Sequence, residues 1–388
     1  MSSGTVIYIG GFEMPDKNAA AHRVLNNAKI FKELGYHVVF CGVDKEKDAS
    51  DYSVEKIGSF DSIPVKYPAN AFEWMTALFD FSHVRRAIES YEDVKFIVSY
   101  NMHAKPLSKL FKYAKKRGVK LIADITEWYE NRFSLNPVKA IKWFDTVMVM
   151  KKLHKKVNGI ISISSYLSSY YAPFVDHIVQ IPPLVDLSED IWNPPQSIDV
   201  QTVEFVYAGF SGKDKDRINL IVDYFYDLKD LSFVFTILGV TREQFLTSYP
   251  GYETKIDALG SKIRFKGRVS HKCSVQNLYS ADYCIFLRDR TRKNMAGFPT
   301  KFVECVTTGI GVIVNDFSNI KDYFPLNHSV LLDTIKREDL ENAIKEKILE
   351  GKIVHTPSDI FDYSREISGM KRFLEGLERD GKGIQKTV

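Results

Sequence analysis

Residues 297–314 read GFPTKFVECVTTGIGVIV, and this stretch decides how the second half of the chain is interpreted. A loop around Pro299 is followed, over residues 300–308, by the residue spacing of a helix. Gly309 and Gly311 end that helix and lead into an apolar run that is typical of a buried strand. The stretch therefore predicts a loop–helix–strand unit of an α/β domain.

The start of this predicted helix is suited to binding phosphate. A helix N-terminus presents unpaired backbone N–H groups and the positive end of the helix dipole. We expect Thr300 to cap the helix, Lys301 to add a full positive charge, and Glu304 to accept hydrogen bonds from ribose hydroxyls. An ordinary capped helix would contain the same residue types, so that interpretation stays open.

A second loop with phosphate-binding chemistry lies in residues 206–216, VYAGFSGKDKD. Gly209 lets a phosphate approach the backbone, and Lys213 and Lys215 would neutralise its charge. Many α/β proteins carry a glycine after a strand, so this loop is informative only beside the first one. Both loops follow strands of one predicted domain, at the edge where open α/β sheets bind ligands.

A third loop, residues 265–272, reads FKGRVSHK and also follows a predicted strand. Arg268 and the backbone of this loop are placed to contact a nucleobase. A basic surface turn is the alternative interpretation.

Apolar runs alternate with amphipathic stretches along the whole chain. Strands are predicted at residues 5–9, 37–41, 96–100, 119–123, 159–162, 203–207, 233–238, 262–265, 283–287 and 311–314. Helices are predicted at residues 18–34, 105–116, 218–228, 275–280, 300–308, 337–350 and 363–378. Such alternation indicates parallel, doubly wound sheets.

The chain divides near residues 181–197, IPPLVDLSEDIWNPPQS, because four prolines oppose both helices and central strands. We predict an N-terminal domain at residues 1–183, a linker at 184–200, a C-terminal domain at 201–357 and a terminal helical segment at 358–388.

Composition excludes several protein classes. Of 388 residues, 45% are hydrophobic and 26% charged, which is typical of a soluble globular protein with two domains. The 53 basic and 49 acidic residues give a net charge of +4, too balanced for a dedicated nucleic-acid binder. The four cysteines form no CxxC pair, no DxD run is convincing as a metal motif, and no signal peptide is visible. We expect a cytoplasmic protein without a metal site.

The second half resembles the donor domain of GT-B glycosyltransferases, especially glycosyltransferase family 4. Its AGFPTKFVE run is similar to bacterial polysaccharide-synthesis members of that family. In the family's E-x7-E motif, Glu304 occupies the second position and Ala296 stands at the first. Phe210 stands where the family has an arginine, and Arg288 or Arg290 is placed to compensate.

This resemblance implies two Rossmann-like domains that face each other across a cleft, with the terminal helix crossing back to the first domain. It implies a retaining, hexosyltransferase-type reaction from a nucleotide-sugar donor to a glycan or lipid-linked acceptor, in cell-surface polysaccharide synthesis. No cofactor or metal is expected, because Lys213, Lys215, Lys301 and helix amides would stabilise the departing diphosphate.

The first half would then bind the acceptor, with its candidate residues at the ends of predicted strands. Gly11 follows the first strand, His103 follows residues 96–100, and Glu127 follows residues 119–123. We assign Gly11 to donor binding and expect His103 and Glu127 to act in catalysis beside Lys213 and Lys301. Helix capping or core packing is the alternative for each residue of the first half.

Basic stretches suggest a site for the peripheral membrane contact of an otherwise soluble enzyme. Residues 105–120 carry seven basic residues and no acidic one, and residues 139–156 carry six lysines against Asp145 alone. A basic amphipathic helix can lie on the anionic inner face of a cell membrane. A solvated face over an ordinary core stripe is the alternative.

Two other functions stay open from sequence. One is a sugar-nucleotide epimerase of GT-B fold, and the other is a non-catalytic protein that binds sugar nucleotides. A dinucleotide oxidoreductase is disfavoured, because no GxGxxG follows the first strand.

Overall fold

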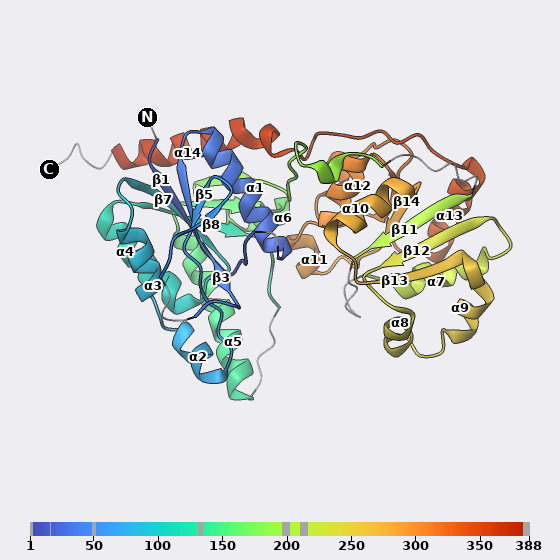
Figure 1. The fold of residues 1–388 in the computed structure, drawn as a ribbon, viewed down its shortest axis with the longest axis horizontal. Coiled ribbons are helices and arrows are strands. Elements are labelled where there is room, and N and C mark those ends of the chain that lie inside the picture. The colour runs from blue at the N-terminus through green and yellow to red at the C-terminus, as the bar shows by residue number, and fades with distance from the viewer. Residues whose placement is uncertain are drawn as a thin grey trace. The chain divides into compact units, whose positions relative to one another are not determined.

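The computed structural model describes residues 3–15, 17–48, 52–130, 135–195, 202–209 and 216–382. The chain forms two compact units, each described here by itself (Figure 1). Unit 1 comprises Met1–Leu184 and Asp362–Val388, and unit 2 comprises Val185–Phe361.

Unit 1 is built on an eight-stranded sheet with the order β10-β9-β8-β7-β1-β2-β5-β4. All neighbouring strands are parallel except the β4–β5 pair. The strands are β1 (Thr5–Gly10), β2 (His37–Cys41), β4 (Glu55–Ile57), β5 (Phe60–Ser62), β7 (Val94–Tyr100), β8 (Lys120–Ile125), β9 (Gly159–Ser162) and β10 (His177–Gln180). A separate parallel pair is formed by β3 (Val43–Asp44) and β6 (Val65–Lys66).

Several helices of unit 1 bury apolar stripes in its core. In α1, Val24, Ala28 and Phe31 lie in the core with spacings of three and four residues. The helices are α1 (Ala19–Glu33), α2 (Ala71–Ala77), α3 (Ser82–Glu89), α4 (Ala104–Arg117), α5 (Pro137–Met148), α6 (Ser165–Tyr171) and α14 (Ile367–Lys382). The last of these, α14, packs Phe373 and Leu377 into the core of unit 1 (red in Figure 1).

Unit 2 contains a six-stranded, all-parallel sheet with the order β13-β12-β11-β14-β15-β16. Its strands are β11 (Val203–Ala208), β12 (Phe233–Leu238), β13 (Ile263–Gly267), β14 (Tyr283–Phe286), β15 (Gly311–Asn315) and β16 (Val330–Leu332). Counted along the unit, this is the 3-2-1-4-5-6 order of doubly wound nucleotide-binding folds. The helices are α7 (Ile218–Asp227), α8 (Arg242–Ser248), α9 (Glu253–Leu259), α10 (His271–Ser280), α11 (Arg292–Ala296), α12 (Thr300–Thr308) and α13 (Arg337–Glu350).

Each strand predicted from the sequence is present, with ends that differ by at most two residues. One local prediction was wrong. Thr300 is the first residue of α12 rather than its cap, because Pro299 takes the cap position and no side chain caps the helix. Residues 139–156 do not form one regular helix: α5 ends at Met148 and continues as a π-helical turn, Val149–Leu153, and a 3-10 turn, His154–Lys156.

None of the helices in the described ranges is both long and apolar enough to cross a membrane.

Candidate functional site

Each sheet has one point where the strand order reverses, and both points lie beside the predicted site residues. In unit 2 the reversal lies between β11 and β14, which are followed by Gly209 and Arg288. In unit 1 it lies between β1 and β7, which lead to Gly11 and Asn101. Doubly wound folds bind ligands outside the carboxyl ends of the strands at this point.

In unit 2, the end of β11 lies directly against Lys301. Gly209 has a φ of +139°, and a Cβ added there would lie 3.2 Å from the Lys301 Nζ atom. A larger residue would be strained by this backbone conformation and crowded by the ammonium group. The glycine therefore brings the strand's backbone close to a buried positive charge.

Asp216 holds that charge and a second one in place. Its Oδ2 atom accepts from Lys301 Nζ at 2.6 Å, and its Oδ1 atom accepts from Arg288 Nε at 2.6 Å. The Tyr207 hydroxyl also donates to Oδ2, at 2.7 Å. All three charged side chains are at least nine-tenths buried, with Asp216 only 1% exposed. This cluster of Asp216, Arg288 and Lys301, the cationic cluster, contains two cations and one carboxylate.

The ionisation of the cationic cluster follows from its geometry. Burial alone would raise the pKa of Asp216, but the charges of Lys301 and Arg288 hold that pKa well below its usual range. Burial lowers the pKa of Lys301, and Arg288 adds to the lowering, while Asp216 opposes it. With Asp216 ionised, the cluster keeps a surplus of one positive charge.

Lys301 retains capacity to bind a further acceptor. Its ammonium group has three N–H donors, and Asp216 is its one hydrogen-bond acceptor among the described residues. The Nζ atom also lies 3.9 Å from the centre of the Tyr207 ring, a cation–π contact. Lys301 is in the first turn of α12, whose uncapped N-terminus adds partial positive charge.

Glu304 and His271 form a second polar pair on the same unit. Glu304 Oε1 lies 3.1 Å from His271 Nε2 at the start of α10. Thr300 and Arg268 are exposed, with Arg268 in the loop between β13 and α10. The structure therefore joins Gly209, Lys301 and Arg288 and places Glu304 one turn along α12.

Other predicted positions of unit 2 lie outside the cationic cluster or outside the described residues. Lys213, Lys215 and Phe210 lie outside the described residues. Ala296, at the first position of the E-x7-E spacing, is fully buried at the end of α11. Arg290 is exposed and pairs with Asp316 at 3.3 Å, so Arg288 is the arginine that joins the cationic cluster.

In unit 1, the strand reversal brings two backbone segments together. A Cβ added to Gly10 would lie 1.7 Å from the Tyr100 carbonyl oxygen, so only glycine fits there. Asn101 adopts a left-handed φ of +48°, which is unusual outside glycine. At Gly11, by contrast, an added Cβ would meet only Asn101, in ordinary contact at 3.8 Å, and Gly11 itself is exposed.

His103 is paired with Asp145, a residue of α5. The His103 Nδ1 atom lies 2.9 Å from Asp145 Oδ2, and the Ala104 backbone N–H donates to Asp145 Oδ1 at 2.7 Å. Asp145 thus caps α4 and orients the imidazole, which leaves Nε2 as the proton acceptor when Nδ1 carries the proton. The edge of the Trp74 ring from α2 also approaches His103, with ring centres 6.2 Å apart.

Glu127 lies apart from this pair, exposed after the end of β8. It interacts with Tyr129, whose pKa is raised by burial and further by the Glu127 charge. Trp128 is buried and packs edge-on against Tyr170, with ring centres 4.8 Å apart. Core packing is therefore the role that the structure gives Trp128.

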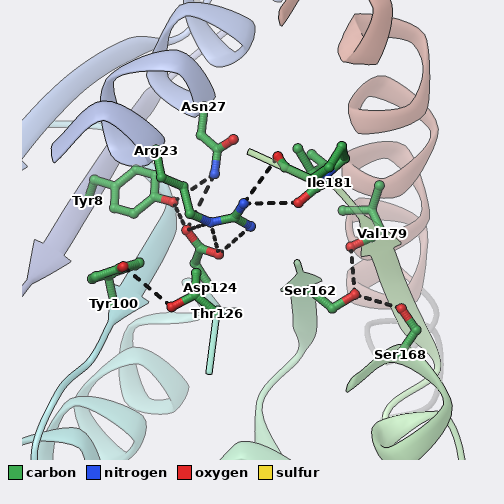
Figure 2. Close-up of polar contacts among 11 residues, drawn as sticks. Tyr8, Arg23, Asn27, Tyr100, Asp124, Thr126, Ser162, Ser168, Val179 and Ile181 are labelled. Carbon is green, nitrogen blue, oxygen red and sulfur yellow. Dashed lines mark hydrogen bonds and ion pairs between the residues drawn. The ribbon is translucent and has the colours of Figure 1, made fainter. Parts of the chain in front are cut away.

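Unit 1 also contains a buried ion pair between α1 and β8 (Figure 2). Arg23 of α1 donates to Asp124 of β8 through Nε at 2.9 Å and Nη2 at 2.7 Å. Its Nη1 atom donates to the Ile181 carbonyl at 2.9 Å, and Tyr8 donates to Asp124 at 2.5 Å. Asp124 of β8 thus joins β1 through Tyr8 and α1 through Arg23, so it holds these elements together.

A cavity of 430 Å³ opens at the carboxyl edge of the unit 1 sheet. Gly11, Asn101 and His103 line one part of it, and α2 lines another through Phe72 and Trp74. Two predicted site residues, Gly11 and His103, therefore share one cavity, and Glu127 is not among its lining residues.

Sequence reasoning missed Asp216 and Asp145, although both hold predicted site residues in place. Asp216 was quoted only as the end of the lysine loop, and Asp145 only as the lone acid of a basic stretch. The available signal was a carboxylate in a lysine-rich stretch: Asp216 follows Asp214 in residues 206–216, and Asp145 is the lone acid of residues 139–156. The spatial neighbour lies 85 positions away for Asp216 and 42 for Asp145.

Among the described residues, no group of three or more His, Cys, Asp or Glu side chains is arranged to hold a metal ion.

No family model matches the chain, and no curated protein matches its sequence. Solved structures match over nearly the full length. Sucrose-phosphate synthase from Thermosynechococcus elongatus aligns with a TM-score of 0.71 at 13% identity, over 97% of this chain and 100% of that one.

Two further solved structures also align with nearly the whole chain. A glycosyltransferase from Rickettsia africae ESF-5 has a TM-score of 0.62 at 14% identity, over 99% of both chains. Anabaena HepE, solved with UDP and glucose, has a TM-score of 0.63 at 10% identity, over 96% of this chain and 99% of that one. The prediction of a GT-B fold is confirmed.

Proposed function

We propose that this chain is a glycosyltransferase that binds a nucleotide-activated sugar in unit 2 and transfers the sugar to an acceptor held by unit 1. The observation that carries the proposal is the surplus positive charge of the cationic cluster at the strand reversal of unit 2. An unbalanced buried charge is costly to a protein, so its presence at a ligand-binding edge favours an anionic ligand.

The chemistry of the proposed ligand matches this electrostatics. A nucleoside-diphosphate sugar carries its negative charge on the diphosphate, and more charge develops there as the glycosidic bond breaks. Lys301, Arg288 and the N–H groups at the start of α12 would stabilise that charge without reorganising. Lys213 and Lys215 are proposed to join them. Glu304 would hold the ribose hydroxyls, and Arg268 would lie near the base.

We further propose that transfer retains the anomeric configuration and requires no metal ion, as the resemblance to family 4 implies. Retention fits a reaction in which the acceptor hydroxyl attacks on the face that the diphosphate leaves. In unit 1, His103 with Asp145 behind it is the group best placed to orient an acceptor hydroxyl. Glu127 is proposed as a second polar contact to the acceptor.

The acceptor class is proposed to be a glycan or a lipid-linked glycan of cell-surface polysaccharide synthesis, handled at the inner face of the membrane. One matched structure is the lipopolysaccharide outer core galactosyltransferase WaaB, with a TM-score of 0.57 at 15% identity. Another was solved with UDP-2-fluoro glucose, and HepE with UDP and glucose. These structures make UDP-sugars the first donors to test.

The test is to incubate the full chain with UDP-, GDP- and ADP-sugars and to measure released nucleoside diphosphate. One donor should give release above the uncatalysed rate, and NMR should show the donor's anomeric configuration in the first product. Isomerised donor without an acceptor would identify an epimerase instead. Tight donor binding without any release would identify a binding protein.

A further inference from the structure

The cavity of unit 1 is mainly apolar, which is unusual for a site that binds only sugar. Its walls include Ile9, Val43, Val65, Tyr67, Phe72 and Trp74. Sugar sites need many well-placed hydrogen-bonding groups, since a sugar's hydroxyls lose water on binding. A wall of this composition fits a hydrocarbon better than a carbohydrate.

The charged residues in the cavity wall are already paired with one another. Lys66 lies 3.0 Å from Glu73, and His83 lies 3.5 Å from Asp80. Apart from His103, the polar groups nearest the strand reversal are the open backbone at Gly11 and Asn101. The cavity therefore has one polar end and a long apolar wall.

The apolar wall continues onto an exposed apolar surface of α2. Phe72 lines the cavity and is 75% exposed, and Met75 and Phe79 beside it are 60% and 58% exposed. No described residue of α2 is buried. A contiguous exposed patch of this kind marks a protein or membrane contact.

Helix α5 also exposes apolar side chains. It has no buried residue, and it exposes Val138, Ile141 and Phe144 by more than half. His103 links the two helices, since it meets Trp74 of α2 and Asp145 of α5. We call the exposed side chains of residues 72–79 and 138–144 the apolar face.

Two lysines give the apolar face a charge that complements a phosphate head group. Lys139 and Lys142 are exposed on α5 among its apolar side chains. Lysine beside exposed aromatic and aliphatic residues is the composition of helices that lie in an anionic bilayer surface. A second protein surface would not require this combination of cation and unpartnered hydrocarbon.

We propose that the unit 1 cavity binds the hydrocarbon chain of a phosphate-bearing lipid acceptor, which enters from an anionic bilayer at the apolar face. The polar end at Gly11, Asn101 and His103 then receives the part of the acceptor that carries the reacting hydroxyl. This inference rests on the proposed transferase function for its acceptor role. Binding of the hydrocarbon chain itself is measured without any sugar nucleotide.

The experiment uses monoalkyl phosphates as probes and the full chain, by calorimetry below the micelle concentration. Each buried methylene strengthens binding about fourfold. Dodecyl phosphate should therefore bind at least a hundredfold more tightly than butyl phosphate. Ala77→Phe fills the cavity from α2 and should weaken dodecyl phosphate binding at least tenfold.

Met75→Phe is the matched control, because it adds a ring to the same helix at a position that does not line the cavity. It should change the affinity less than twofold. Equal affinity for the two alkyl phosphates, or equal affinity of the native chain and Ala77→Phe, would overturn the proposal. Concentration-dependent dimers that involve the apolar face, with no chain-length dependence, would identify a second copy as the occupant and also overturn it.

A second arm identifies the source of the lipid. The chain should sediment with phosphatidylglycerol vesicles, less with phosphatidylcholine vesicles, and at least tenfold less after Ile141→Asp with Phe144→Asp. Those two changes should leave dodecyl phosphate affinity within twofold. Sedimentation unaffected by both changes would overturn entry at the apolar face. UDP-sugar binding by unit 2 is a separate readout, so failure of the donor proposal is distinguishable.

Discussion

Each unit buries an ion cluster beneath its strand reversal, and the two clusters differ in charge balance. In unit 1, Arg23 meets Asp124 one to one, and its remaining donors reach backbone carbonyls. In unit 2, one carboxylate, Asp216, faces both Arg288 and Lys301. A balanced ion pair needs no external counter-charge. A buried surplus of positive charge favours the binding of an external anion.

The carboxyl edges of the two sheets differ in the same way as the ion clusters beneath them. In unit 2 the strand end at Gly209 lies on the Lys301 ammonium group. In unit 1 the space above Gly11 leads into an apolar cavity. The same doubly wound topology thus carries a buried surplus positive charge in one unit and a mainly apolar cavity in the other. The comparison predicts that equivalent substitutions in the two units will affect stability alike and donor binding differently.

The largest effect is expected when each cluster loses its carboxylate. Asp216→Ala leaves two buried cations unpaired, and Asp124→Ala leaves one, so each should destabilise its unit by about 3–5 kcal/mol. Denaturant unfolding, followed separately for the two units by local probes, measures this. Asp289→Ala removes an exposed carboxylate that pairs with Arg217 and should cost about 0–1 kcal/mol.

Nucleoside diphosphate should distinguish the two variants. A diphosphate ligand should restore part of the stability lost in Asp216→Ala, because it supplies negative charge to Arg288 and Lys301. It should give Asp124→Ala no more stabilisation than it gives the native chain. Equal responses of the two variants would show that the unit 2 charge is as purely structural as that of unit 1.

Protonation removes the same carboxylate charge without a mutation. The pKa of folded Asp216 is held below its ordinary value of about 4, so its ionised form stabilises the fold above that pH. This stabilisation is lost as pH falls below 4 towards the folded pKa. The unfolding free energy of unit 2 should therefore decline more steeply with acid in the native chain than in Asp216→Asn. Identical slopes would contradict the assignment.

Lys301→Ala removes the surplus charge but leaves a balanced Arg288–Asp216 pair, so the fold should be retained. Transfer should fall tenfold or more, which corresponds to over about 1.4 kcal/mol of transition-state stabilisation. The measurement is kcat/KM for the donor. Lys293→Ala, an exposed lysine of α11, is the control and should change it less than twofold. Unchanged kinetics in a folded Lys301→Ala variant would refute its role at the diphosphate.

Asp145→Asn tests the polar end of the unit 1 cavity. Asparagine can still accept from the Ala104 N–H, so α4 should keep its cap. Loss of the carboxylate behind His103 should lower kcat about tenfold, part of the effect of a positioned acid–base group, and leave the donor KM unchanged. Asp80→Asn removes the other carboxylate–histidine pair of the cavity and should have little effect. If both variants behave alike, His103 has no special place in the reaction.

The smallest effect is expected from metal removal. If lysine, arginine and helix amides neutralise the diphosphate, activity should persist in excess EDTA. Rates with and without chelator are the measurement. Complete loss that magnesium or manganese restores would show that the cationic cluster is insufficient.

The fold was predictable because its signals are local. Apolar runs such as residues 233–238 and the glycines after α12 define elements within a few residues, and all ten predicted strands are present. Short helices with no buried residue, such as α2, were missed because their pattern contains no core stripe. Edge strands β4 and β16, of three residues each, are too short to show a period.

The site was predictable only in part, for a physical reason. Gly209 and Lys301 stand in motifs whose chemistry is visible along the sequence. Asp216, which pairs with Lys301, lies 85 positions from it in the sequence, and sequence periodicity does not indicate such a contact. The apolar cavity is likewise assembled from separate segments. Proposals that depend on Lys213 and Lys215, which lie outside the described residues, remain predictions.

The most direct test of the account is the binding of nucleoside diphosphates to the full chain, measured by calorimetry. We predict that UDP, or another nucleoside diphosphate, binds at least tenfold more tightly than its monophosphate and nucleoside. This preference should shrink in Lys301→Ala and persist in an Arg23→Lys variant of unit 1. Equal affinity for diphosphate and nucleoside, or a preference that Lys301→Ala leaves intact, would contradict the claim that the surplus charge of unit 2 binds a diphosphate.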